Sequence, residues 1–296
     1  MSDSETSTSE ILRAVKRVQL ATRKAVTDMV AGGFASVFRG SGMEFEEVRE
    51  YVPGDDVRAI DWNVTARTGR PYIKKFVEER EQTILLVHDI SASTRLGSRR
   101  RAVRHAAAEL AGILAFSAIQ SGDRAGYVAF SDRVELELPP RGSTHQAFRI
   151  IREALYRQAE HVGTSIAEAA GHVARVLKRR AYVFVLSDFL DEGFERALGM
   201  LARKHDVVAL RLVDPLHETL PAVGLVRWRD PETGREHLVD SSSRAVRDEI
   251  AARAERRRQD LRTLLRSRGV DLVDISLDGS VVEPLIAYLH QRERRR

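Results

Sequence analysis

The chain has 296 residues, of which 43% are hydrophobic, and its 48 Lys and Arg residues against 43 Asp and Glu residues give a formal net charge of +5. This length allows one large core with a smaller unit attached. The absence of cysteine excludes disulfide bonds and thiol catalysis, and no apolar run approaches the ~20 residues that a membrane-spanning helix needs. We therefore expect a cytoplasmic protein with no membrane span.

The chain begins with a polar, acidic stretch, which predicts a disordered tail over residues 1–10 and not a signal peptide. Apolar residues then recur at roughly helical spacing from Ile11 to Met29. This periodicity predicts an amphipathic helix that packs on its own domain. Gly32 and Gly33 are expected to end the helix.

A strand, a short helix and a second strand are expected next, so that residues 11–82 form an N-terminal helix and arm. Basic and acidic side chains are interleaved along the arm. They predict either a salt-bridge lattice that fixes the arm onto the core domain or a docking surface for a partner protein. Trp62 is expected to lie in the core. The residues that we select for partner binding are Arg58, Asp61, Arg67 and Lys74.

Residues 83–291 alternate between buried strands and helices that are joined by short links. This pattern predicts an α/β domain with a doubly wound, mostly parallel sheet. In a hairpin-like pair over 125–138, the second strand alternates polar and apolar residues, which predicts one antiparallel edge strand. A closing helix ends near residue 291 and leaves a basic tail over 292–296.

Oxygen-bearing side chains follow two of the buried strands. The apolar run 84–87 leads into the spacing Asp-x-Ser-x-Ser, the apolar run 181–186 leads to a carboxylate, and a Gly-Thr-Ser sequence precedes a helix between them. One Asp-x-Ser-x-Ser alone also fits a strand end that caps the next helix. Open α/β sheets bind ligands at this carboxyl edge, and hard oxygen ligands suit Mg²⁺ or Mn²⁺ better than zinc or copper. The expected metal ligands are Asp89, Ser91, Ser93, Thr164 and Asp188.

These three pieces, in this order, resemble the von Willebrand factor A (VWA) fold with its metal-ion-dependent adhesion site, from about Ile84 to the C-terminus. The run 49–62, with Ala66, Arg67 and the run 74–81, is similar to a bacterial family catalogued as domain of unknown function fifty-eight. That family is a set of VWA-like proteins commonly encoded beside MoxR-type AAA+ ATPases. The resemblance implies a VWA or Rossmann-like sheet. Many relatives begin with a pair of membrane helices, which this sequence lacks.

The resemblance implies a non-enzymatic protein-interaction module, an adaptor for a MoxR-type AAA+ ATPase in the assembly or maturation of other proteins. An acidic side chain of a protein ligand would complete the shell of the metal. One alternative is a metal-dependent phosphohydrolase, because His88 precedes Asp89, but strand alternation points these side chains to opposite sides. A second alternative is nucleic-acid binding through the basic runs 99–101, 256–258 and 292–296, which no aromatic platform accompanies. The sequence contains no P-loop and no Ser/His/Asp order, and we expect no enzyme.

Overall fold

The computed structural model describes residues 8–31, 43–78, 81–95, 103–229 and 235–295. Helix α1 (Thr8–Ala31) therefore begins inside the tail expected over 1–10, and the rest of that tail lies outside the described residues. The two glycines expected to end α1 and the basic run 99–101 also lie outside them. Helix α10 (Val282–Glu293) extends two residues into the expected basic tail.

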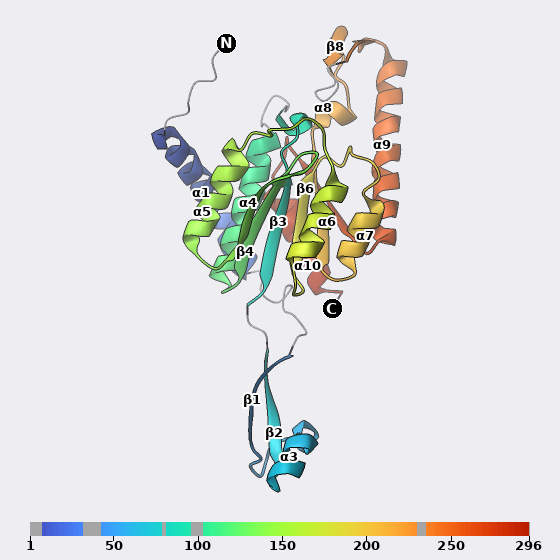
Figure 1. Ribbon diagram of the computed structural model, residues 1–296. Helices are drawn as coiled ribbons and strands as arrows, with labels where there is room; N and C mark the ends of the chain where they lie inside the picture. The colour runs from blue at the N-terminus through green and yellow to red at the C-terminus, as the bar shows by residue number, and fades with distance from the viewer. Residues whose placement is uncertain (1–7, 32–42, 79–80, 96–102, 230–234, 296) are drawn as a thin grey trace.

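A six-stranded sheet forms the centre of the molecule, with the strand order β10-β7-β6-β3-β4-β5 (Figure 1). Every neighbouring pair is parallel except β4 and β5, which are antiparallel. The prediction of a doubly wound, mostly parallel sheet with one antiparallel edge strand is confirmed. The strands are β3 (Thr83–Asp89), β4 (Arg124–Phe130), β5 (Val134–Arg141), β6 (Tyr182–Ser187), β7 (Asp206–Val213) and β10 (Asp271–Ser276).

Helices cover both faces of the sheet, which is why the run 84–87 of the central strand is continuously apolar. In β3, Ile84 and Leu86 point into one core, whereas Leu85 and Val87 point into the other. The first core lies under α1, α4, α5 and α10, and the second under α6, α7 and α9. The bounds of the helices not yet given are α4 (Val103–Gln120), α5 (Thr144–Tyr156), α6 (Ile166–Val176), α7 (Glu195–Ala202) and α9 (Arg244–Ser267).

Helix α1 packs on α4, as its periodicity predicts, and buries Val15 and Met29 against it. The helices approach closely at Gly112 of α4. A Cβ atom placed there would lie 3.0 Å from a methyl group of Ile151 on α5 and 3.5 Å from Val18 on α1. The N-terminal helix therefore packs as part of the main body and is not a separate membrane-binding helix.

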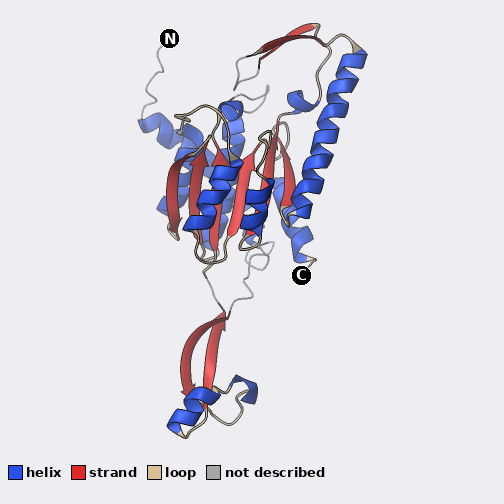
Figure 2. Ribbon diagram, turned by 45° about the vertical axis from the view of Figure 1, so that its right-hand side comes forward, coloured by secondary structure: helices blue, strands red, loops and turns tan. Residues whose placement is uncertain are grey.

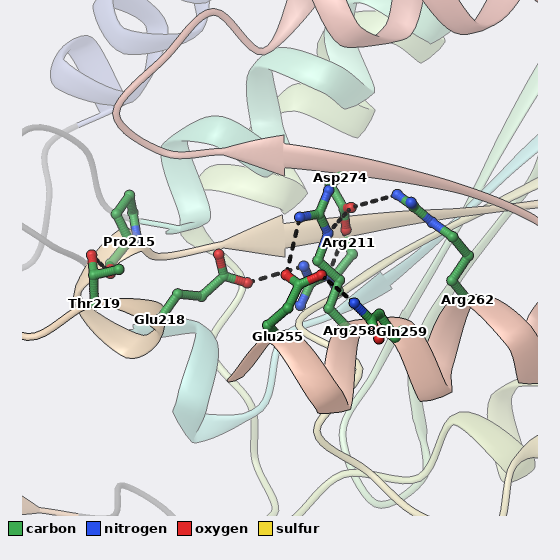
Figure 3. Close-up of polar contacts among 9 residues, drawn as sticks. All are labelled: Arg211, Pro215, Glu218, Thr219, Glu255, Arg258, Gln259, Arg262 and Asp274. Atoms are coloured by element: carbon green, nitrogen blue, oxygen red, sulfur yellow. Dashed lines mark hydrogen bonds and ion pairs between the residues drawn. The ribbon is translucent and has the colours of Figure 1, made fainter. Parts of the chain in front are cut away.

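Ion pairs attach the long, mostly polar helix α9 to the sheet (Figure 3). Asp274 of β10 accepts hydrogen bonds from Arg211 Nε (2.6 Å) and Arg258 Nε (3.0 Å). Arg211 also pairs with Glu218 of the short helix α8 (Pro215–Glu218) at 3.0 Å. This network joins α8, α9 and the sheet, and the Arg211 side chain at its centre is only 9% exposed. A two-stranded hairpin, β8 (Leu225–Arg229) and β9 (Glu236–Asp240), precedes α9.

The arm lies beyond the amino end of β3 and projects from the main body in both views (Figures 1 and 2). Its strands β1 (Met43–Glu50) and β2 (Tyr72–Glu78) are antiparallel, with a bulge between Phe45 and Glu47. Between them lie the short 3₁₀ helix η1 (Val57–Ala59) and helix α3 (Trp62–Thr68).

The structure corrects the expectation for Trp62, whose surface is 69% exposed. This side chain starts the short helix α3, which has one face on β2. Among the described residues, no second layer of structure covers the other face of α3, so they form no core there to bury Trp62. Two described ion pairs, Arg49–Asp55 and Arg70–Glu50, lie within the arm and fix its own loop and strands. At the base of the arm, Glu81 pairs with Arg124 of β4, so an ion pair also joins the arm to the core domain.

In the described part of the chain, none of the helices has both the length and the hydropathy to cross a membrane.

Candidate metal centre

Asp89 lies at the carboxyl end of β3 and is fully buried. Its Oδ1 accepts a hydrogen bond from the backbone N–H of Ser91 (2.9 Å), and its Oδ2 accepts one from Ser187 Oγ (2.7 Å). Ser187 is the last residue of the neighbouring strand β6. The carboxylate is therefore held in one orientation by its own loop and by the adjacent strand.

The two hydroxyl groups that follow Asp89 lie together. Ser91 is fully buried, and its Oγ lies 3.1 Å from Ser93 Oγ. The chain turns there into the short 3₁₀ helix η2 (Ala92–Arg95). The N–H of Ile90 donates to the Phe130 carbonyl (2.9 Å), which ties the start of this turn to the end of β4.

The turn after β6 places Asp188 directly beyond Ser187. Asp188 Oδ1 accepts from the N–H of Leu190 (3.0 Å), and Ser187 Oγ accepts from the N–H of Phe189 (3.1 Å). Phe189 has a positive φ of 56°, a conformation that is costly for a residue with a side chain. Its ring packs edge-on against Phe194 at 5.9 Å, and burial of this aromatic pair holds the turn in place. Such strain is found where surrounding structure fixes a functional turn.

The loop that carries Thr164 is tied to both neighbouring strand ends. The N–H of Ser165 donates to the Ser131 carbonyl after β4 (2.8 Å), and the N–H of Ile166 donates to Asp191 Oδ2 after β6 (2.8 Å). Ser165 also caps α6. The structure thus brings the three predicted segments to one edge of the sheet, as the parallel order β6-β3-β4 requires.

Glu135 of β5 fixes the earlier part of the same loop. Its carboxylate accepts hydrogen bonds from Ser131 Oγ (2.5 Å), from the N–H of Glu160 (2.9 Å) and from the N–H of His161 (3.3 Å). One side chain therefore joins the loop after β4 to the loop that precedes α6.

The electrostatics of this edge favour a bound cation. Burial, and then the nearby charge of Asp188, raise the pKa of Asp89 above its usual range. Burial also raises the pKa of Asp191, and the charge of Asp188 contributes. In the described ranges, neither Asp89 nor Asp188 forms an ion pair with Lys or Arg. A positive ion would relieve both the burial cost and the repulsion between the carboxylates.

The donor set fits Mg²⁺ or Mn²⁺. Two carboxylates and three hydroxyl groups offer only hard oxygen atoms, with water to complete an octahedral shell. Within the residues that the structure describes, no group of three or more His, Cys, Asp or Glu side chains has the arrangement of a metal site. A centre at this edge would therefore depend on hydroxyl groups and not on the nitrogen, sulfur or multiple carboxylate ligands of zinc and di-iron sites.

The sequence interpretation missed Ser187 and Asp191. Ser187 directly precedes Asp188 at a strand end, so the Ser-Asp pair was the available signal for a side chain that faces the neighbouring strand. Asp191 was harder to predict from the sequence, because its contact with the N-terminus of α6 joins residues 25 positions apart. His88 behaves as strand alternation predicts. It is buried, its Nδ1 lies 2.7 Å from the Tyr127 hydroxyl, and burial lowers its pKa to about 3.

The four residues selected for partner binding lie in the arm and not at the metal edge. Asp61 is buried and caps α3, with its Oδ1 accepting from the N–H groups of Asn63 (2.9 Å) and Val64 (3.3 Å). Arg58 and Arg67 are exposed. Lys74 lies in β2 opposite Val48 of β1.

Comparison with known proteins shows related chains of unknown activity. The family described as "Protein of unknown function DUF58" matches residues 47–260. The uncharacterized protein Rv1480 of Mycobacterium tuberculosis is 31% identical over 290 residues, which cover 96% of this chain and 90% of that protein. Among solved structures, the conserved hypothetical protein BatB from Bacteroides thetaiotaomicron is 18% identical with a TM-score of 0.45, over 72% of this chain and 98% of that one. The VWA domain of SpRpn10 is 8% identical with a TM-score of 0.38, over 70% and 95% of the two chains.

Proposed function

The chain belongs to the DUF58 family, and we propose that it is a non-enzymatic protein-interaction module with a Mg²⁺ or Mn²⁺ site at the carboxyl edge of its sheet. The proposed ligands, direct or through water, are Asp89, Ser91, Ser93, Thr164 and Asp188. The observation that carries the proposal is the buried Asp89 carboxylate. It is oriented by two hydrogen bonds, lies beside a second carboxylate and has no Lys or Arg partner in the described chain.

The charge of this site explains what it would bind. Two ionised carboxylates neutralise a divalent ion, and the hydroxyl groups add dipoles without charge. The ion would then supply an electrophilic position for one more anionic oxygen. An Asp or Glu side chain of a partner protein fits that position, whereas a general base for hydrolysis would have to reach the same edge. His88 points away from the edge into the core, where it contacts Tyr127.

The partner side of the proposal follows from family membership. We propose that the chain is an adaptor for a MoxR-type AAA+ ATPase in the assembly or maturation of other proteins. The metal edge would hold a client through its acidic side chain, and the ATPase would act on the client. The support for this role is the resemblance of the arm's charged sequence to the family signature, together with a fold typical of interaction modules.

Calorimetric titration of Mg²⁺ and Mn²⁺ into the chelator-treated full chain tests the metal site. We expect saturable binding of a single ion, lost in Asp89→Ala and kept in Asp132→Ala. Asp132 is the matched control because it lies at the same edge but pairs with Arg133 (3.0 Å). No binding by the folded wild-type chain, or equal binding by Asp89→Ala, would contradict the site.

The adaptor role is tested separately by surface plasmon resonance with a purified MoxR-type ATPase from the same organism, with and without ATP. We expect saturable binding to the wild-type chain. Absence of binding in every nucleotide state would refute the adaptor role and leave the metal site unaffected.

A further inference from the structure

The tip of the arm, residues 52–70, is a fixed platform and not a loose loop. The guanidinium group of Arg49 binds both carboxylate oxygens of Asp55 (2.7 and 2.9 Å), and Asp55 also accepts from the N–H of Val52 (2.9 Å). On the other side of the tip, the Thr65 hydroxyl accepts from the N–H of Tyr72 (3.1 Å). These contacts hold η1 and α3 at the end of the two-stranded arm (Figure 2).

This platform presents large apolar side chains to solvent. Trp62 is 69% exposed and Val57 is 61% exposed. In α3, the half-buried Val64 faces inward, and helical spacing places Trp62 and Ala66 together on the outer face, with Arg67 beside them. An exposed Trp on a projecting arm is unusual for a folded protein, and Trp and Arg are enriched where binding energy concentrates in interfaces.

The charges of the tip show which partner surface would complement it. Its carboxylates are used internally: Asp55 binds Arg49, Asp56 accepts from the N–H of Arg58 (2.9 Å), and Asp61 caps α3. By contrast, the guanidinium groups of Arg58 and Arg67 form no ion pair or hydrogen bond within the described residues. The unused charge around Trp62 is therefore positive.

We infer that the arm tip is a second docking surface, which takes an acidic face of a partner protein with an apolar pocket for Trp62. The candidate metal centre lies at the carboxyl end of β3, and the arm precedes the amino end of the same strand (Figure 1). At roughly 3.3 Å per residue, the 7 residues of β3 keep the two surfaces more than about 20 Å apart. One chain thus engages two proteins at once, which is the geometry that an adaptor requires.

This inference rests on the proposed function, because the partner used to test it is the ATPase proposed above. The measurement is the affinity of that ATPase for four forms of the full chain by surface plasmon resonance. They are the wild type, Trp62→Ala, the double variant Arg58→Glu with Arg67→Glu, and Leu238→Ala. Leu238, on β9, is the matched control because it is also a large apolar side chain with 70% exposure. Each substituted side chain is exposed, so each variant keeps its fold, which circular dichroism checks.

We expect Trp62→Ala to weaken binding by roughly 30-fold, the effect of losing a central aromatic anchor. Wild-type binding should weaken as NaCl is raised from about 50 to about 300 mM, and the double variant should bind at least as weakly as Trp62→Ala and lose this weakening with salt. Leu238→Ala should bind as the wild type does. Mg²⁺ binding should be unchanged in all four forms, which separates the tip from the metal edge.

Three results would overturn the inference. If the wild type binds the ATPase and Trp62→Ala binds equally well, the tip is not the docking surface, although the adaptor role stands. If the wild type does not bind, both the adaptor role and the inference fail. If Trp62→Ala instead converts a dimer to a monomer in sedimentation while ATPase binding is unchanged, the tip joins two copies of this chain.

Discussion

Replacing Ser187 with alanine tests whether the hydrogen bond between neighbouring strands prepares Asp89 to hold a cation. The substitution removes the hydroxyl group that donates to Asp89 Oδ2 (2.7 Å) and accepts from the N–H of Phe189 (3.1 Å). A hydrogen bond to an ionised group contributes about 1.5–3 kcal/mol. If the whole loss falls on the ionised, metal-binding form of Asp89, Mg²⁺ binding weakens by about 10- to 100-fold, because about 1.4 kcal/mol corresponds to a factor of ten. Loss of other side chains that orient metal ligands has effects of the same size.

Isothermal titration calorimetry of Mg²⁺ binding to the chelator-treated full chain measures this change in affinity. Ser117→Ala is the control, because Ser117 is also a fully buried serine, whose hydroxyl contacts Met29 Sδ (3.9 Å) far from the metal edge. We expect Ser117→Ala to bind Mg²⁺ as tightly as the wild type. Equal affinities of Ser187→Ala and the wild type would refute the reasoning, as would a similar loss in both serine variants.

Three further predictions concern pH, loop position and ion pairing. Burial raises the pKa of Asp123 from 3.8 to about 6, so its ionisation costs folding stability, a cost that begins above pH ~4 and is complete above about pH 6. We expect Asp123→Asn to raise the free energy of unfolding by up to about 3 kcal/mol at pH 8 and by nothing below pH ~4. Urea unfolding across this pH range checks the prediction. A gain that does not depend on pH, or the same gain in the exposed control Asp278→Asn, would contradict it. We expect Glu135→Gln to weaken Mg²⁺ binding about tenfold, because Glu135 fixes the loop before α6 that carries Thr164. An Mg²⁺ affinity equal to that of the wild type, measured by calorimetry, would contradict this prediction. Asp274→Asn leaves the buried Arg211 short of one partner and should cost about 3 kcal/mol in thermal unfolding, whereas a loss below about 1 kcal/mol would show that the network is dispensable.

The strands around the candidate metal centre could be predicted because their pattern is local. A strand covered on both faces reads as a continuous apolar run, so the run 84–87 identifies a central strand and its end identifies the edge where a ligand is expected. Parallel neighbours then bring Asp89 and Asp188 to the same edge. The orientation of Asp89 could not be predicted in this way. The donor of one of its hydrogen bonds, Ser187, lies 98 residues away in the chain, and the sequence does not encode their contact locally.

In the arm, too, local features could be predicted from the sequence, whereas tertiary contacts could not. A turn at Pro53 and Gly54 followed by a short helix could be predicted from the local sequence, and the structure divides that helix into η1 and α3. The charged pattern did not show which pairs stay within the arm, as Arg49–Asp55 does, and which reach the core domain, as Glu81–Arg124 does.

The sequence by itself determined the fold class, the family and the edge where oxygen-bearing side chains gather, because burial along a strand and polar residues at its end are local properties. Only the tertiary structure decided that Trp62 faces solvent. Exposure depends on which elements pack over a residue, and in the arm a two-stranded sheet with one short helix offers a single face for packing, so the other face of α3 remains open.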